Sequence, residues 1–265
     1  MKIYSGFSLR FGLKIQCMSK FSDHFSTQAG AYAEFRPQYP KAVFEWLSSL
    51  CSDHNLAWDV ATGNGQAAEA LAPYFKAVHA TDASAKQIAE ARPWENIRYA
   101  VEPADLCSLE NNSADLVTVA QALHWFAHDN FYAEVKRVIK PGGVFAAWGY
   151  SLHSIEPAID DIVTKFYAFI VGKFWPPERM YVEQYYRTLP FPFTTMTTPD
   201  FAIEEDYSLE QLMGYLTSWS ATQRYIKERG ENPLALIADD LRQAWGDTQK
   251  RRVRWPLFFK VTQIH

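Results

Sequence analysis

Short apolar runs alternate with amphipathic segments between residues 40 and 150. The apolar runs predict buried strands at 56–61, 77–81, 97–101, 114–120 and 144–148. Between them, apolar residues recur three and four positions apart, which predicts helices at 67–74, 84–92 and 130–140. Strands that alternate with helices are typical of a parallel, doubly wound sheet.

The pattern changes after Tyr150. Residues 156–190 are predicted to be helical and are rich in aromatic side chains, and 208–245 predict further helices, split by Gly230 and Pro233. Two more strands are expected, at 199–206 and 251–263. A strand that follows helices in this way is typical of an antiparallel addition at a sheet edge. We therefore expect an α/β fold, Rossmann-like, with a seven-stranded, mostly parallel sheet, an antiparallel last strand and a helical cap.

The length of 265 residues suits one large domain. We expect lid helices and a cofactor-binding core at 18–150, a helical insertion at 151–195, and the rest of the core with further cap helices at 196–265. Residues 1–17 are predicted to be a disordered extension, because Met18 reads like a second start.

Composition narrows the possible partners. Lys and Arg number 26 against 30 Asp and Glu, so no basic excess favours nucleic acid. The basic run at 250–254 is interpreted as the exposed face of an edge strand. Three cysteines without paired spacing indicate a reducing compartment, and no apolar run approaches the ~18 residues of a membrane span. We expect a cytoplasmic monomer or homodimer without a metal site.

A glycine loop follows the first strand of the core. Asp59 ends that strand, and Gly63 and Gly65 allow a tight turn that a ligand can approach closely. The loop also fits a dinucleotide fingerprint, and Asp82, at the end of the second strand, suits the ribose of NAD as well as that of another nucleoside. Asp59 would repel a pyrophosphate but attract an ammonium group. The two carboxylates together favour S-adenosylmethionine, with an NAD-dependent oxidoreductase as the alternative.

Several stretches resemble a known family. Its core motifs are matched by DVATGNGQ, HATDAS, YAVEPADLCSL, ADLVTVAQALHWF and RVIKPGGVFAAWGY. Together they resemble the class I S-adenosylmethionine-dependent methyltransferases. The flanking stretches TQAGAYAEFRPQYP, FWPPER, PFPF and LTSWSATQRY are similar to the trans-aconitate methyltransferase-like group, also called methyltransferase type 11. The resemblance implies methyl transfer by in-line displacement to a small, possibly carboxylate-bearing, molecule.

The resemblance also implies roles around the cofactor. Asp59, Gly63 and Gly65 would surround the methionine part, and Gln121 and Ala122 would line its other side. Further implied contacts are Asp82 for the ribose, Ala83 for the adenine ring and Asp105 for the adenine amino group. One position departs from the family pattern, because Ala61 stands where glycine is usual.

Candidate residues for the acceptor side come from four segments. His124 follows the fourth strand and is a candidate orienter or base, with Trp125 as a pocket wall. Tyr32 and Arg36 are expected to contact the cofactor from an N-terminal lid, whereas substrate contacts are expected from Tyr39, Arg179, Trp219 and Tyr225. Each has a plainer interpretation, because lone arginines usually form surface ion pairs and regularly spaced aromatics usually pack a core. A non-catalytic cofactor-binding protein and a protein or RNA methyltransferase remain alternatives.

Overall fold

The computed structural model describes residues 36–264. Within them, seven strands form one sheet in the order β3-β2-β1-β4-β5-β7-β6. The strands are β1 (Leu56–Val60), β2 (Ala77–Asp82), β3 (Ile97–Val101), β4 (Ala114–Ala120), β5 (Ile139–Tyr150), β6 (Ala202–Tyr207) and β7 (Arg251–Gln263). The first five are parallel, and β7 pairs antiparallel with both β5 and β6. The predicted α/β fold and its antiparallel last strand are confirmed.

Helices cover the parallel part of the sheet. They are α2 (Lys41–Ser49), α3 (Gln66–Leu71), α4 (Ala85–Ala89) and α5 (Asp129–Val138). The sequence predicted that α5 would reach residue 140 and that the next strand would begin at 144. Both boundaries were wrong, because β5 already begins at Ile139 and takes in Pro141 and two glycines. The proline and the two glycines had indicated the end of a helix. In the structure Gly142 has a φ of +81°, a turned conformation that lies inside the strand.

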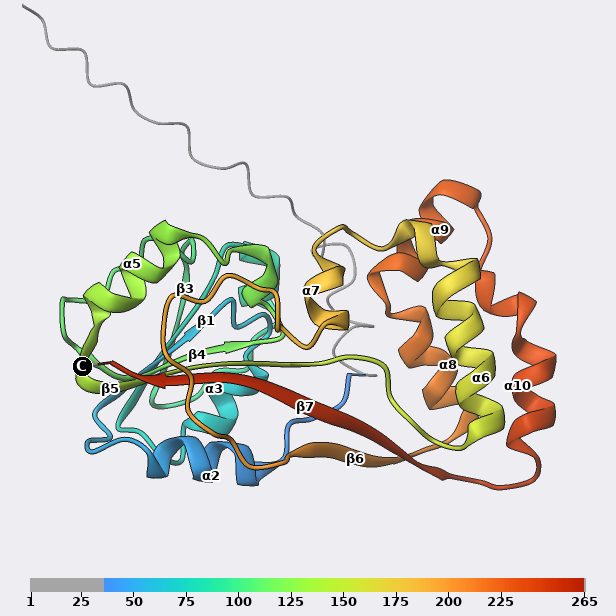
Figure 1. The fold of residues 1–265 in the computed structure, drawn as a ribbon, viewed down its shortest axis with the longest axis horizontal. Coiled ribbons are helices and arrows are strands. Elements are labelled where there is room, and N and C mark those ends of the chain that lie inside the picture. Colours follow the sequence, from blue (N-terminus) through green and yellow to red (C-terminus); the bar gives the residue numbers. More distant parts are fainter. Residues whose placement is uncertain (1–35, 265) are drawn as a thin grey trace, which may run out of the picture.

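A second group of helices forms the cap, which comprises α6 (Pro157–Lys165), α7 (Arg179–Glu183), α8 (Leu209–Thr217), α9 (Ser220–Arg229) and α10 (Ala238–Trp245). A π-helical turn at Phe166–Ile170 and short 3₁₀ turns at Gly172–Phe174 and Pro233–Leu236 link them. Figure 1 shows α6, α8, α9 and α10 grouped beyond one end of the sheet, with α7 between them and the core.

The cap has its own hydrophobic core. Phe166, Trp219, Leu241 and Trp255 are buried there, apart from the two clusters that pack on either side of the parallel strands. Much of the aromatic content of the chain therefore packs the cap itself. Among residues 36–264, every helix is too short or too polar to cross a bilayer.

Strands β6 and β7 connect the core to the cap (Figure 1). Their outer face carries ion pairs across the strands: Arg252 Nε lies 2.7 Å from Asp206 Oδ1, and Arg254 Nε lies 3.2 Å from Glu204 Oε1. These pairs explain the basic run near the C-terminus. Arg252 and Arg254 face solvent and acidic neighbours on β6, whereas Arg251 pairs with Glu156. The expectation of an edge strand was wrong, because β7 lies between β5 and β6 and the strand at the edge is β6.

Candidate active site

The glycine loop connects β1 to α3 through a series of left-handed residues. Ala61, Gly63 and Gly65 have φ values of +53°, +60° and +96°. The left-handed φ already favours glycine at position 65. A β-carbon there would also lie 2.5 Å from Tyr99 Oη. Around Gly63, by contrast, such an atom would meet only the Gln87 amide oxygen, at 3.7 Å. The loop therefore packs tightly on β3 while leaving backbone at Gly63 open to a ligand.

Asp82 joins the glycine loop to the next loop along the sheet edge. Its Oδ2 accepts a hydrogen bond from Gly63 N at 3.0 Å, and its Oδ1 accepts one from Ser84 N at 2.8 Å. Ser84 also caps α4, as its sequence position predicted. The carboxylate is thus fixed at the carboxyl ends of β1 and β2, where doubly wound sheets bind their ligands.

Asp59 lies beneath the loop and is fully buried. Its carboxylate accepts hydrogen bonds from Thr62 Oγ1 at 2.5 Å and from Thr118 Oγ1 at 2.8 Å. Burial raises the pKa of Asp59 to about 6, although both hydroxyls oppose that shift. Asp59 therefore braces the loop, and its expected contact with a ligand ammonium group stays a prediction.

The expected adenine side lies after β2 and β3. Ala83 directly follows Asp82, and Asp105 follows β3, both partly exposed. Beside Asp105, the Leu106 side chain is 62% exposed, an apolar surface that the sequence reasoning missed. In the sequence, the only sign of this surface was Leu106 itself, an apolar residue directly after the acidic Asp105.

Gln121 ends β4 in a left-handed conformation, with φ +55°. Its side-chain amide donates to Tyr150 O at 2.9 Å and accepts from Tyr150 N at 2.8 Å. Both polar ends of this side chain therefore hold the end of β5 against the end of β4. Next to it, Ala122 is buried beneath the loop that carries His124.

A small cavity of about 50 Å³ lies where this edge of the sheet meets the cap. Six predicted residues share it: Arg36, Gln121, His124, Trp125, Arg179 and Trp219. Five further residues complete its lining: Tyr150, Trp175, Pro176, Tyr215 and Ser220. The described lining contains two guanidinium groups and no carboxylate, so the cavity favours an anion.

Arg179 is oriented by the cap. Its Nε donates to Tyr167 Oη at 2.9 Å, and Tyr167 in turn donates to Glu183 Oε1 at 2.5 Å. The guanidinium carbon lies 4.7 Å from the ring centroid of Trp175, in cation–π range. Across the cavity, Arg36 donates from Nη1 to Tyr150 Oη at 3.2 Å. Both arginines are therefore positioned before any ligand binds.

His124 lies on the 3₁₀ turn Leu123–Trp125 and is only 9% exposed. Its Nδ1 is 3.0 Å from Tyr186 Oη. Burial, with a smaller contribution from the nearby Arg179 charge, lowers the pKa of His124 to about 3. The imidazole is therefore neutral near pH 7.

Other predicted residues lie elsewhere. Tyr39 packs edge-on against Trp148, with 5.5 Å between ring centroids, and Tyr225 packs against Phe174 at 5.1 Å. Neither belongs to the cavity lining, so the structure favours their plainer interpretation as packing residues. Tyr32 and the extension at 1–17 lie outside the described residues.

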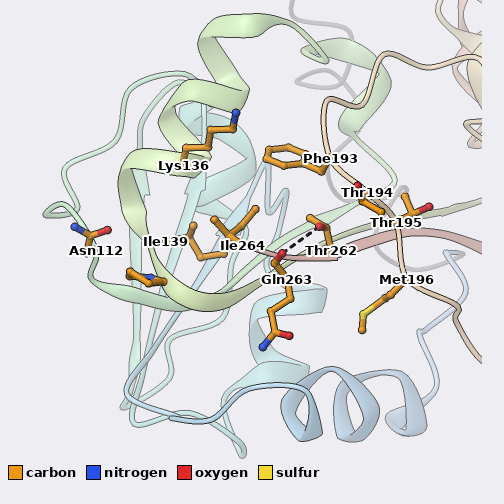
Figure 2. Close-up of a pocket in the computed structure, with 11 residues that line it drawn as sticks. Asn112, Lys136, Ile139, Phe193, Thr194, Thr195, Met196, Thr262, Gln263 and Ile264 are labelled. Atoms are coloured by element: carbon orange, nitrogen blue, oxygen red, sulfur yellow. Dashed lines mark hydrogen bonds between the residues drawn. The ribbon is translucent and has the colours of Figure 1, made fainter.

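A larger cavity, of about 700 Å³, lies on the opposite edge of the sheet. Figure 2 shows its lining, which includes Lys136, Phe193 and Thr262. It adjoins the amino end of β5 and the last residues of β7. The glycine loop and Asp82 lie at the carboxyl ends of the strands, so this cavity is remote from the chemistry argued above.

Comparison with known proteins identifies the family. A family model described as a methyltransferase domain matches residues 58–147. A protein of Dictyostelium discoideum named as a methyltransferase is 33% identical over 253 residues, which cover 92% of this chain and 96% of that protein. The chain belongs to the methyltransferase family. The structure of a protein named as a type II methyltransferase, from Anaeromyxobacter dehalogenans, is 42% identical with a TM-score of 0.81, covering 87% of this chain and 99% of that one.

Membership of this methyltransferase family makes S-adenosylmethionine the cofactor and sets aside the NAD alternative. The loop residues fit this cofactor. The stretch from Asp59 to Gln66 contains no Lys or Arg that would neutralise a pyrophosphate, while Gly63 leaves its backbone accessible. Asp82 offers fixed acceptor oxygens, which suit the hydroxyls of a ribose.

Proposed function

We propose that this methyltransferase esterifies a carboxylate of a small anionic molecule. One observation carries the proposal: the cavity beside the cofactor loops is lined by two oriented arginines, while His124, the one imidazole among its described lining residues, is a poor base because burial lowers its pKa. The trans-aconitate methyltransferase-like resemblance points to the same class of acceptor.

The charge of the cavity supports an anionic acceptor. Arg36 comes from the N-terminal segment and Arg179 from α7, so the two guanidinium groups reach the cavity from different elements. A guanidinium group binds a carboxylate through paired hydrogen bonds, which orients it as well as attracting it. Trp125, Trp175 and Trp219 surround these groups with ring faces that exclude water.

The weakness of His124 as a base favours an acceptor atom that carries no proton. The pKa of His124 is lowered to about 3, and burial raises the pKa of Tyr215 to about 12. A phenol, alcohol or ammonium group would have to lose a proton, whereas a carboxylic acid is already ionised near pH 7. A carboxylate therefore suits this cavity, because it needs no proton removed before it attacks.

S-adenosylmethionine supplies a methyl group on an electron-poor sulfur, so a carboxylate oxygen that attacks it forms an ester while the S–C electron pair returns to sulfur. No proton moves in this step. The work of the chain is to bind the carboxylate, align it and exclude water. The cavity of about 50 Å³ is small, so an acceptor has to be held close to the residues that line it.

The test is an assay with radiolabelled S-adenosylmethionine and a panel of small carboxylic acids, each paired with its amide and its alcohol. We expect label in base-labile methyl esters of the acids alone. We also expect Arg179→Gln to raise KM for the acid about 10- to 100-fold, because a charge-assisted hydrogen bond is lost. Arg187→Gln is the matched control, since Arg187 lies outside the cavity lining and its guanidinium group lies over the exposed Tyr185 ring.

Two outcomes would contradict the proposal. Transfer to the amides or alcohols at comparable rates would show that a base is present after all. Label that appears in protein or RNA and in none of the acids would show that the acceptor is a macromolecule.

A further inference from the structure

We infer that Tyr186 is a positioning residue that holds His124 as the Nε2–H tautomer, so that His124 donates a hydrogen bond to the acceptor. The catalytic role of this tautomer, donation to the acceptor, rests on the proposed function. The tautomer itself can be measured without any activity.

The contact that carries this inference is buried. Tyr186 Oη lies 3.0 Å from His124 Nδ1, and Tyr186 is fully buried. Because Nδ1 is engaged on this side, Nε2 is the ring nitrogen left for the cavity that His124 lines. Whichever nitrogen carries the proton therefore decides whether His124 offers a donor or an acceptor to a ligand.

The surroundings of Tyr186 fix the direction of the hydrogen bond. Among the hydrogen bonds of the described residues, His124 Nδ1 is the side-chain partner of the Tyr186 hydroxyl. Because a fully buried phenol proton needs an acceptor, the hydroxyl donates to Nδ1. Nδ1 is then unprotonated, and the single proton of the neutral ring lies on Nε2.

A strained turn aims Tyr186 at this position. Tyr185 and Tyr186 are consecutive non-glycine residues with φ values of +53° and +57°. Each costs about 1–2 kcal/mol in this conformation, and such strain gathers at functional sites. The turn is closed by Tyr186 N, which donates to Tyr181 O at 2.8 Å, and Phe258 packs edge-on against the Tyr186 ring at 4.9 Å.

Burial keeps the His124 ring neutral by lowering its pKa, and the positive charge of Arg179 adds to this effect by disfavouring a second proton on the imidazole. A neutral Nε2–H beside Arg36 and Arg179 gives the cavity a third donor without a third charge. Three donors from three elements can fix both oxygens of a carboxylate, leaving the lone pair of one oxygen directed at the methyl group.

The direct test is nitrogen NMR on the full chain labelled with ¹⁵N-histidine, near pH 7, with the His124 signals assigned by their loss in His124→Gln. We expect a neutral ring protonated at Nε2. In Tyr186→Phe the phenol donor is absent, so we expect a substantial population protonated at Nδ1. Tyr185→Phe is the matched control, because Tyr185 shares the strained turn but is 46% exposed and is expected to leave the His124 signals unchanged.

A kinetic arm tests the positioning role. We expect Tyr186→Phe to raise KM for the carboxylate about tenfold with binding of S-adenosylhomocysteine unchanged, while the thermal midpoint falls only as far as the loss of one buried hydrogen bond requires. The inference is overturned if wild-type His124 is protonated at Nδ1, or if Tyr185→Phe shifts the tautomer as much as Tyr186→Phe does. An Nε2–H tautomer in a chain that methylates no acid would instead overturn the proposed function alone.

Discussion

Gly65 and Tyr99 are in such close contact that a β-carbon on Gly65 would lie 2.5 Å from Tyr99 Oη. The Gly65 φ of +96° adds a second constraint. We therefore expect Gly65→Ala to destabilise the chain by about 2–4 kcal/mol, combining the left-handed penalty with overpacking. It should also weaken binding of S-adenosylhomocysteine, since the loop has to shift. Urea unfolding and calorimetric titration measure the two effects.

Gly142→Ala separates the two causes. Gly142 has a similar φ of +81°, but a β-carbon there would meet no atom within 4 Å. It should cost only about 1–2 kcal/mol, the backbone penalty, and leave cofactor binding intact. Adding Tyr99→Phe to Gly65→Ala removes the closest atom and should restore part of the stability. Equal losses for the two glycine variants would mean that the contact with Tyr99 is unimportant.

Ala61 offers the opposite experiment. It occupies the position where related sequences are expected to have glycine, and its φ is +53°. We expect Ala61→Gly to be neutral or to stabilise the chain by up to about 1 kcal/mol, because relief of the left-handed strain offsets the extra freedom of glycine in the unfolded chain. Ala70→Gly, within α3, is the control and should lose about 1 kcal/mol. Thermal unfolding measures the stability of both variants. A loss of stability in Ala61→Gly equal to that in Ala70→Gly would contradict the strain argument.

The sequence predicted the fold well where the signal is local. The buried strands appear as short apolar runs, and Gly230 and Pro233 mark real helix boundaries: Gly230 ends α9 at φ +77°, and Pro233 begins a 3₁₀ turn. The end of α5 was misplaced because the Pro141-Gly-Gly stretch is a stop signal for a helix and can equally stand inside a strand. Which one forms depends on pairing with β4 and β7, which is not local.

The site could be predicted only in part from the sequence, because some of its contacts are also not local. Arg36, His124 and Arg179 stand in loops or at helix starts, and such positions predict function. Tyr225 lies within α9 and Tyr186 follows α7, but nothing in their local sequence separates a packing ring from one bonded to His124. That difference arises from the left-handed turn at Tyr185–Tyr186, which is a product of tertiary packing.

Asp59 predicts a pH dependence of cofactor binding. Its pKa in the free chain is raised to about 6, and the ionised form is the one that attracts the methionine ammonium group. Affinity for S-adenosylhomocysteine should therefore fall as the pH drops through about 6, and Asp59→Asn should bind weakly with little pH dependence. Calorimetric titration between about pH 8 and pH 5 gives the profile.

Asp82→Asn is the control for this profile. It should also weaken binding, since it alters the fixed oxygens expected to hold the ribose, but Asp59 remains and the fall near pH 6 should persist. If the fall in affinity near pH 6 disappears in Asp82→Asn but persists in Asp59→Asn, the assignment of this titration to Asp59 is wrong.

His153 predicts how the cap responds to acid. Its ring lies between Tyr215 and Trp255, with centroids 5.6 Å from each, and neither ring nitrogen has a hydrogen-bond partner among the described residues. Burial lowers its pKa to about 4. Because the folded pKa is below the unfolded value of 6.5, the unfolded chain binds the extra proton first. Stability should fall as the pH drops from about 6.5 to 4, by an amount on the order of 3 kcal/mol.

Urea unfolding across this range, compared between variants, isolates the His153 contribution. Asp59 acts in the opposite sense, since its raised pKa adds stability as the pH falls below about 6, so the net slope of the wild type understates the histidine effect. His153→Phe places an apolar ring in the aromatic cluster and should be more stable near pH 5 and flatter toward acid. His128→Asn, at the exposed cap of α5, replaces a different histidine while keeping a capping side chain and should retain the wild-type slope. An unchanged slope in His153→Phe would mean that the buried imidazole is hydrated and does not govern the acid response of the cap.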